Sequence, residues 1–196
     1  MSKIANYFNQ SAQNIENLKT FENKILDISN EIIKAKKEKK KLLVAGNGGS
    51  CSDAEHFVGE LQCTYKDRFR EPISAISLAS LPAAVTAWCN DFGFLSFFKR
   101  QVEAHGNNGD ILFLISTGGG DQKSGASMSL VEAAKEAKKR NLKVISLIGK
   151  SGGILKEISD ISIIVENNIT SFIQEAHISI LHCICENLEK NLNEKN

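Results

Sequence analysis

Five short apolar segments, separated by segments with helical periodicity, are the feature that most restricts the fold of this chain. They contain mainly Ile, Val and Leu and show no regular alternation of apolar and polar residues, which predicts strands buried on both faces. Strands of this kind alternating with helices predict an α/β fold, a three-layer α-β-α sandwich with a five-stranded parallel sheet of the flavodoxin-like type. The predicted strands are Leu42–Ala45, Ile73–Leu78, Ile111–Ile115, Val144–Ile148 and Ile161–Val165.

Helices are predicted between the strands and at both ends of the chain. Helical periodicity is clear at residues 51–64, 92–104, 127–140 and 170–190. Residues 1–40 form a long, polar helical arm with spaced apolar positions, and this arm is longer than one face of a small sheet needs. We therefore expect it to pack between subunits. With two prolines, no repeat and no linker, the chain is predicted to be one domain, with the arm followed by an α/β core at 41–196.

Composition and charge exclude several classes of protein. A net charge of +1 argues against a nucleic-acid-binding protein, and 42% hydrophobic residues argue against disorder. The first residues lack the apolar run of a signal peptide, and no segment is long enough to cross a membrane. Five cysteines without CxxC spacing indicate reduced thiols. We therefore expect a cytoplasmic protein with no nucleic-acid or membrane partner.

Glycine- and serine-rich segments follow three of the predicted strands, at the ends where open parallel sheets bind ligands. They are Gly46–Ser50, Ser116–Ser127 and Gly149–Gly153. Glycines let the backbone approach an anion, hydroxyl groups donate hydrogen bonds, and a helix N-terminus adds a positive dipole. The first segment is not GxGxxG and no P-loop follows the first or fourth strand, which argues against nucleotides. One such segment is explained by turn chemistry alone, but two on neighbouring strands favour a small phosphorylated metabolite.

Two pairs of polar side chains on predicted helices have the chemistry of metal ligands. His56 and Glu60 are four residues apart and share one helix face directly after the first glycine-rich segment. Gln174 and His182 are eight residues apart on the last helix. Together they would supply nitrogen and oxygen donors suited to Zn²⁺. The spacing equally fits exposed helix-face contacts, so both interpretations stay open on the residues alone.

Longer segments resemble the sugar isomerase (SIS) family and, within it, the phosphoheptose isomerases. GNGGS and the later Ser-Thr pair indicate only an SIS domain that binds a phosphosugar. HFxxE and IQExHxxxxH are typical of the heptose enzymes. The matching segments are GNGGS at 46–50, DAEHFVGEL at 53–61, NDFGF at 90–94, RQVEA at 100–104, GDILFLIST at 109–117 and IQEAHISILH at 173–182.

The resemblance implies an aldose–ketose isomerase that converts D-sedoheptulose 7-phosphate to D-glycero-D-manno-heptose 7-phosphate through a cis-enediol, for the heptose of bacterial surface glycans. It also implies a homotetramer with active sites between subunits and one zinc ion per subunit. In this interpretation Glu60 is the base and His182 the acid. The implied zinc ligands are His56, Glu60, Gln174 and His182. The implied substrate contacts are Asn47, Gly48, Gly49, Ser50, Glu60, Asn90, Asp91, Ser116, Thr117, Gly118, Ser127 and Gln174.

The phosphate-binding loop departs from the family pattern. The family runs STSGNS directly into a helix, whereas this chain inserts GGGDQK at 118–123 before SGAS. Aligning the helix that follows makes Ser127 the counterpart of the third phosphate serine. Ser124 is the alternative, and the sequence leaves the choice open.

Two substitutions leave the substrate open as well. Thr64 replaces a basic residue of the family, and Ser171 and Phe172 replace an Asp-Arg pair. An isomerase of a related phosphosugar, such as arabinose 5-phosphate, is therefore an alternative hypothesis. Another is a non-catalytic SIS regulator that binds a replication initiator. Proteins of that group lack the His–Glu and His positions, which this chain retains.

Overall fold

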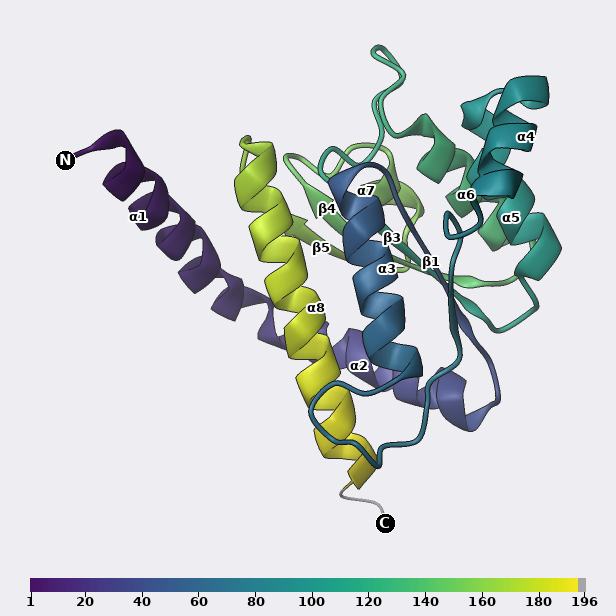
Figure 1. Ribbon diagram of the computed structural model, residues 1–196, viewed down its shortest axis with the longest axis horizontal. Coiled ribbons are helices and arrows are strands. Elements are labelled where there is room, and N and C mark those ends of the chain that lie inside the picture. Colours follow the sequence, from purple (N-terminus) through teal and green to yellow (C-terminus); the bar gives the residue numbers. More distant parts are fainter. Residues whose placement is uncertain (194–196) are drawn as a thin grey trace.

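A computed structural model describes residues 1–193 as a parallel sheet between two layers of helices (Figure 1). The strands are β1 (Leu42–Gly46), β2 (Ala75–Ser77), β3 (Ile111–Ser116), β4 (Lys143–Gly149) and β5 (Ile161–Val165). Their order is β2-β1-β3-β4-β5, and every neighbouring pair is parallel. This order confirms the predicted flavodoxin-like α-β-α sandwich. The edge strand β2 is shorter than the predicted segment.

The sheet separates two hydrophobic cores, and alternate residues of each central strand face opposite cores. In β1, Leu42 and Val44 belong to one core and Leu43 and Ala45 to the other. A strand buried on both sides has no polar face, which is why the sequence shows continuous apolar runs. The first core is covered by α2 (Glu22–Lys37), α3 (Gly49–Gln62) and α8 (Thr170–Asn193), and the second by α5 (Phe97–His105), α6 (Met128–Lys139) and α7 (Leu155–Ile158).

The N-terminal arm divides into a packed part and a projecting part. In α2, Ile25, Ile28 and Ile32 are buried in the first core, so this helix belongs to the sandwich itself. The preceding α1 (Lys3–Glu16) buries no residue and extends away from the body (Figure 1). In α1, the hydroxyl groups of Tyr7 and Ser11 each donate a hydrogen bond to the carboxylate of Glu175 in α8, both at 2.5 Å. The part of the predicted arm left for other contacts is therefore α1.

The predicted start of the helix at 92–104 is wrong. The chain instead forms α4 (Pro82–Phe92), a short 3₁₀ turn and then α5. Gly93 separates them with a φ of 79°, a conformation that side-chain-bearing residues rarely adopt. Pro82 stands at the start of α4, where its missing N–H costs no hydrogen bond.

Three smaller features concern membrane-spanning helices, the cysteines and the lysine-rich segment. Over residues 1–193, none of the helices combines the length and apolar character needed to cross a membrane. The five cysteines are free thiols. At the end of α2, Lys34 and Lys37 are exposed and Lys36 pairs with Glu71 at 2.7 Å, so the lysine-rich segment is a solvated helix end.

Candidate active site

The two loops predicted to bind phosphate meet at the point where the strand order reverses. β1 and β3 are neighbours, but the chain continues from β1 to β2 on one side and from β3 to β4 on the other. Ligands of open α/β sheets bind in the crevice that this reversal creates at the carboxyl ends of the strands. Asn47 follows β1, and its Nδ2 donates to Oγ of Ser129 in α6 at 3.4 Å. Ser116 ends β3 beside it.

The serine-rich loop after β3 gathers hydroxyl and amide groups around Ser116. Oγ of Ser116 donates to Oγ of Ser127 at 3.1 Å. It accepts hydrogen bonds from the backbone N–H groups of Gly118 at 3.4 Å and Gly119 at 3.0 Å. Thr117 is half-buried between them. The structure therefore brings Ser127 to Ser116 across the inserted residues.

The three glycines of the insertion are packed into the molecule, whereas residues 121–126 form an exposed loop that projects from the carboxyl edge of the sheet (Figure 1). The backbone N–H of Asp121 donates to the carbonyl of Ala126 at 2.9 Å, which closes the loop. The Asp121 carboxylate accepts from the hydroxyl of Ser124 at 2.8 Å and from the backbone of Lys123 at 2.9 Å. These hydrogen bonds lower the pKa of Asp121. Ser124 is thus engaged within the insertion, away from the Ser116–Ser127 pair.

The third glycine-rich segment, after β4, supports the second one. Directly after this segment, the backbone N–H groups of Ile154 and Leu155 donate to the carbonyl oxygens of Gly120 at 3.1 Å and Gly119 at 2.8 Å, respectively. A Cβ added at Gly153 would lie 2.6 Å from the carbonyl oxygen of Gly118. This close packing fixes the backbone of the serine-rich loop.

Helices α3 and α8 begin at the same edge of the sheet and run side by side (Figure 1). At their first turns Gly49 faces Gln174. A Cβ added at Gly49 would lie 2.3 Å from Nε2 of Gln174, so a larger residue there would displace the Gln174 amide. The preceding Gly48 has a φ of 56°, which also favours glycine. Ser50 is buried in the same turn. This end of the helix pair is therefore shaped by the first glycine-rich segment.

Further along the same two helices, His56 contacts both candidate proton-transfer groups. Its Nε2 lies 3.1 Å from Oε1 of Glu60 and 3.4 Å from Nε2 of His182. The side chain of His56 is 46% exposed and that of Glu60 23%, so both can be reached by a ligand. The ring of Tyr65 stacks on His182, with centroids 5.9 Å apart and planes 27° apart. The arrangement can move a proton at two positions of one bound molecule.

Two groups of predicted residues are not brought to this cluster. Gln174 lies eight residues from His182, about 12 Å along the helix axis, and its amide rests against Gly49. Among residues 1–193, no three His, Cys, Asp or Glu side chains form a group ready to hold a metal ion. Asn90 and Asp91 are exposed on α4, which packs on the other face of the sheet, and bond to each other at 2.9 Å. The zinc site stays a prediction.

The comparisons with known proteins decide the family. The SIS domain model matches residues 6–149. The chain is 44% identical over 156 residues to the phosphoheptose isomerase of Helicobacter pylori strain P12, covering 80% of this chain and 78% of that protein. This chain belongs to the phosphoheptose isomerase family of SIS-domain proteins. The predicted family and the predicted enzyme class, an isomerase, are confirmed.

Solved structures of two similar proteins have the same fold. A phosphoheptose isomerase from Francisella tularensis superposes with a TM-score of 0.89 at 34% identity, covering 97% of this chain and all of that one (100%). A phosphoheptose isomerase from Neisseria gonorrhoeae superposes with a TM-score of 0.87 at 30% identity, covering 96% and 97% of the two chains. The similarity extends over the whole SIS domain and the helix that carries Gln174 and His182.

Several residues of this isomerase family member that sequence reasoning missed surround the cluster. Tyr65, Arg70 and Glu189 lie directly beside it. Tyr65 and Arg70 stand in a loop without periodic spacing, and Glu189 lies seven residues after His182 on the same helix. Asp53 precedes His56 by about one helical turn. Burial raises the pKa of the Asp53 carboxyl above its usual value, and the charge of His56 opposes this shift only in part. Its Oδ2 is buried without a hydrogen-bond partner in the described part of the chain.

His177, on the same helix as the cluster, is excluded from proton transfer by burial. His177 lies between Gln174 and His182 in the sequence of α8, and its ring is fully buried. Burial lowers the pKa of His177 to about 4, and the backbone of Ile148 opposes this shift only in part. At neutral pH the ring of this isomerase is therefore uncharged and packed.

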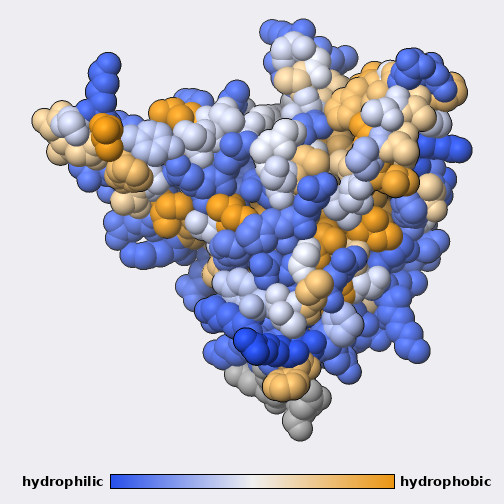
Figure 2. Space-filling model, viewed as in Figure 1, coloured by the Kyte–Doolittle hydropathy of each residue, from blue (hydrophilic) through white to orange (hydrophobic). Residues whose placement is uncertain are grey.

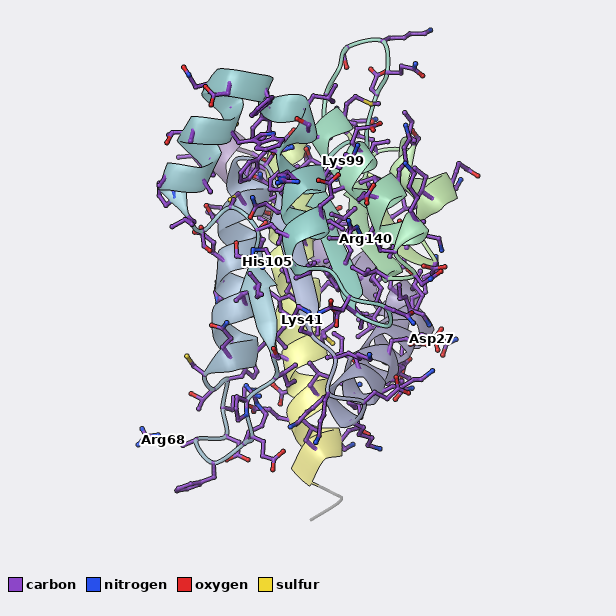
Figure 3. All side chains as sticks on the ribbon, turned by 90° about the vertical axis from the view of Figure 1, so that its right-hand side faces the viewer. Asp27, Lys41, Arg68, Lys99, His105 and Arg140 are labelled. Carbon is purple, nitrogen blue, oxygen red and sulfur yellow. The ribbon has the colours of Figure 1, made fainter. Side chains whose placement is uncertain are left out.

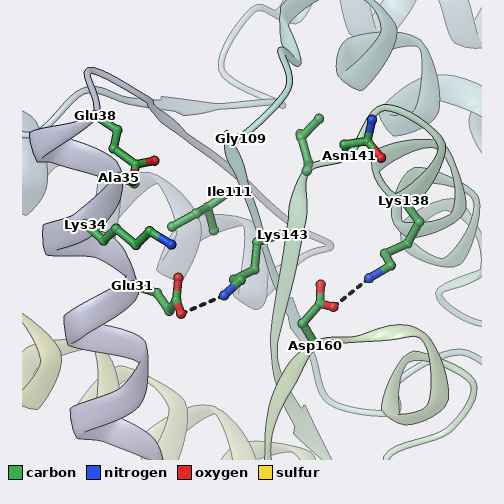
Figure 4. A pocket seen from close by; sticks show the side chains of 11 residues that line it. Glu31, Lys34, Ala35, Glu38, Gly109, Ile111, Lys138, Asn141, Lys143 and Asp160 are labelled. Carbon is green, nitrogen blue, oxygen red and sulfur yellow. Dashed lines mark hydrogen bonds and ion pairs between the residues drawn. The ribbon is translucent and has the colours of Figure 1, made fainter.

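A second polar pocket lies at the opposite, amino edge of the sheet (Figure 4). It is lined by the end of α2 and the beginnings of β3 and β4. Glu31 pairs with Lys143 and Lys138 with Asp160, each at 2.6 Å. Since two of its lysines already neutralise carboxylates, this pocket is a weaker anion site than the SIS loops at the carboxyl edge.

Proposed function

We propose that this SIS-domain isomerase converts D-sedoheptulose 7-phosphate to D-glycero-D-manno-heptose 7-phosphate through a cis-enediol, in the cytoplasm. The observation that carries the proposal is the contact of His56 with both Glu60 and His182, on helices that begin at the edge of the serine-rich loop. The names of the similar proteins support a heptose phosphate as substrate. We also propose a role in heptose synthesis for bacterial surface glycans, which family membership supports only through the names of the similar proteins.

The side chains have the roles that moving a carbonyl from C2 to C1 requires. The Glu60 carboxylate removes a proton from C1, and the electrons of the C1–H bond form the C1–C2 double bond. His182 donates a proton to the C2 oxygen, which gives the cis-enediol. In the second half, the O1–H proton returns to His182 as the C1 carbonyl forms, and Glu60 delivers its proton to C2. No net proton is gained or lost, so both groups end as they began.

The serine-rich loop would bind the phosphate at the far end of the sugar. The hydroxyl groups of Ser116 and Ser127 lie next to backbone N–H groups at the carboxyl end of β3. Phosphate held there would fix the reacting carbons beside Glu60, and remote binding energy would serve orientation. Asn47, at the end of β1, borders the same crevice.

Replacing Ser127 with Ala is expected to raise KM for the sugar phosphate about 10- to 100-fold, since one hydrogen bond to a charged group is lost. We expect kcat to change less, because the hydroxyl is remote from Glu60. Steady-state kinetics would measure both. Ser124→Ala is the matched control, because Ser124 bonds to Asp121 within the insertion. A raised KM in the control, with a normal KM in Ser127→Ala, would assign phosphate binding to the inserted loop instead.

We also propose that His56, Glu60 and His182 bind one zinc ion per subunit, with Gln174 as the predicted fourth ligand. The donor pairs at His56 are 3.1 and 3.4 Å apart. Donors of a tetrahedral zinc site, with bonds of 2.0–2.1 Å, are about 3.3 Å apart, so these two donor pairs have a spacing close to that of zinc ligands. Bound zinc would polarise the carbonyl and hydroxyl oxygens of the substrate.

The family's homotetramer is proposed for this chain because two of its helices have no fully buried residue in the described chain. α4 buries no residue, although much of it is apolar. Figure 2 shows apolar side chains gathered at this corner of the molecule, where Leu81, Phe92 and Leu95 are 62%, 65% and 57% exposed. α1 also buries no residue and borders an apolar pocket of about 490 Å³ against α8. A neighbouring subunit would cover these surfaces and could complete the active site, to which α4 contributes nothing within one chain.

Light scattering of the purified protein is expected to give about four times the chain mass of 21.5 kDa. Phe92→Asp should shift the mass to smaller species, because a charge would be buried in the contact. Phe69→Asp is the control, since Phe69 is 94% exposed at the other end of the molecule. A wild-type mass of a single chain would contradict the tetramer.

The proposed reaction is tested by turnover of sedoheptulose 7-phosphate, measured beside arabinose 5-phosphate. We expect turnover of the heptose compound and little of the pentose. Phe172 makes the comparison necessary, because it is buried against the ring of Tyr7 at 4.8 Å and leaves no charge where the family has one. Turnover of the pentose alone would indicate a related phosphosugar isomerase, and turnover of neither would contradict the proposal.

A further inference from the structure

The loop at residues 63–70, between α3 and β2, carries two arginines in opposite environments. Arg68 points into solvent (Figure 3), whereas the side chain of Arg70 is only 2% exposed. The guanidinium of Arg70 donates to the carbonyl oxygens of Glu60 at 2.5 Å and Leu61 at 3.2 Å. The last carbonyl groups of a helix have no partner within it. Arg70 therefore holds the end of α3 at the backbone of Glu60 itself.

Arg70 is paired with a buried carboxylate on the other helix of the site. Its Nε donates to Oε1 of Glu189 at 3.2 Å, and the side chain of Glu189 is 9% exposed. The same carboxylate accepts backbone N–H groups from each of residues 65–67 at 3.1 Å. Glu189 follows His182 by seven residues, two helical turns, and so shares its helix face. The pair thus ties the loop to the helix that carries His182.

Tyr65 connects this pair to the imidazole. The backbone of Tyr65 is held by Glu189, and its ring stacks on His182. One continuous series of contacts therefore runs from the backbone of Glu60 through Arg70 and Glu189 to the ring of His182. Both ends of the series are proton-transfer groups of the proposed reaction.

We propose that Arg70 and Glu189 are positioning residues, which fix the distance between Glu60 and His182 during isomerisation. The inference rests on the proposed function. A buried ion pair is by itself weak evidence for a stabilising role, because desolvation offsets its attraction. The planar guanidinium, however, is the group that can bond to a carboxylate and to helix carbonyls at the same time. Misplacement of a reacting group by about 1 Å can lower the rate about 100-fold, so loss of these contacts is expected to have a measurable effect on kcat.

Arg70→Lys tests this role while keeping the charge next to Glu189. A lysine has one nitrogen in place of the three that bond to Glu189 and to the two helix carbonyls, so it cannot reproduce this planar arrangement. We expect kcat for sedoheptulose 7-phosphate to fall about 10- to 100-fold, with KM within about threefold of wild type, because the phosphate loop is left intact. Arg68→Gln, in the same loop but in solvent, is expected to keep wild-type kinetics.

Tyr65 variants separate the ring from its hydroxyl. Tyr65→Phe keeps the stacking on His182 and should keep kcat, whereas Tyr65→Ala should lower kcat as Arg70→Lys does. The double variant Arg70→Gln/Glu189→Gln leaves no unpaired buried charge. If Arg70→Lys does not fold, kcat and KM are measured on this double variant instead. Wild-type kcat in folded variants, or a rise of KM as large as the fall of kcat, would overturn the positioning role.

The NMR resonances of the His182 ring give a readout that does not need turnover. The ring current of Tyr65 shifts them in the wild type. They are expected to move in Arg70→Lys and Tyr65→Ala, and to stay in place in Arg68→Gln. Unmoved resonances in Arg70→Lys would overturn the inference even if the wild type proved inactive. An inactive wild type with moved resonances would instead contradict the proposed function and leave the positioning contacts supported.

Discussion

Replacing Glu60 with Gln is expected to lower turnover of sedoheptulose 7-phosphate by about 1000-fold or more while the protein keeps its fold. General acid–base catalysis contributes about 10²- to 10⁴-fold, and an amide cannot accept the proton from carbon. Gln has nearly the same shape as Glu, and its oxygen can still approach His56, which lies 3.1 Å from the carboxylate. The loss therefore reports on the carboxylate itself, as base and as proposed zinc ligand, and not on packing.

The measurement is kcat of Glu60→Gln, with thermal unfolding and calorimetric phosphosugar binding on the same preparation. Glu55→Gln is the matched control, because Glu55 is an exposed carboxylate on the same helix, outside the cluster. The control should turn over substrate like the wild type. Undiminished turnover in Glu60→Gln would remove this residue from the mechanism, and loss of phosphosugar binding would show that its role is in the ground state.

The sheet could be predicted from the sequence because its strands are buried on both faces. Such strands leave continuous apolar runs that are bounded by polar residues and glycine, and the runs at β1 and β3 mark the observed strands to within one residue. Right-handed crossovers then favour a doubly wound sheet, and the observed strand order is that of the flavodoxin-like class. The same sequence logic placed the two phosphate loops side by side, and the structure shows them at the reversal of strand order.

α4 was not predicted, although Ala84, Val85, Trp88 and Cys89 form a half-buried apolar stripe against the second core. None of its residues is fully buried, so the stripe is a weak signal, and residues 92–104 read as one helix, whereas Gly93 separates two. If α4 packs on another subunit, its pattern reflects a surface that a single chain does not contain. The helix is thus difficult to predict for the same reason that it is exposed.

Within the site, the residues that move protons were easier to identify than the residues that hold them. The spacing of His56 and Glu60 on one helix is a local signal, and the family motif adds His182. Arg70 and Glu189 are 119 positions apart and meet only in the folded chain, so no periodicity links them. Gln174 lies on the same helix as His182 and its amide rests on Gly49, so its role as a zinc ligand stays a prediction.

His56→Ala is expected to reduce bound zinc from one ion per chain to a small fraction. Zinc sites contribute about 10–16 kcal/mol, so one of four ligands carries about 2.5–4 kcal/mol, or about 100- to 1000-fold in affinity. His56 is the decisive position because it alone contacts both Glu60 and His182 among the four predicted ligands of the described chain. Removing it leaves the other donors without their common neighbour.

Metal analysis of the purified protein measures this directly, and His105→Ala provides the control. His105 is exposed at the end of α5 (Figure 3), outside the cluster, so its removal should leave the zinc content unchanged. A chelator should then abolish turnover of the wild type, and added zinc should restore it. Full activity of a metal-free wild type would show that Glu60 and His182 suffice without the ion. Equal zinc in His56→Ala and the control would place the metal elsewhere and leave the contacts of His56 as hydrogen bonds between the acid and the base.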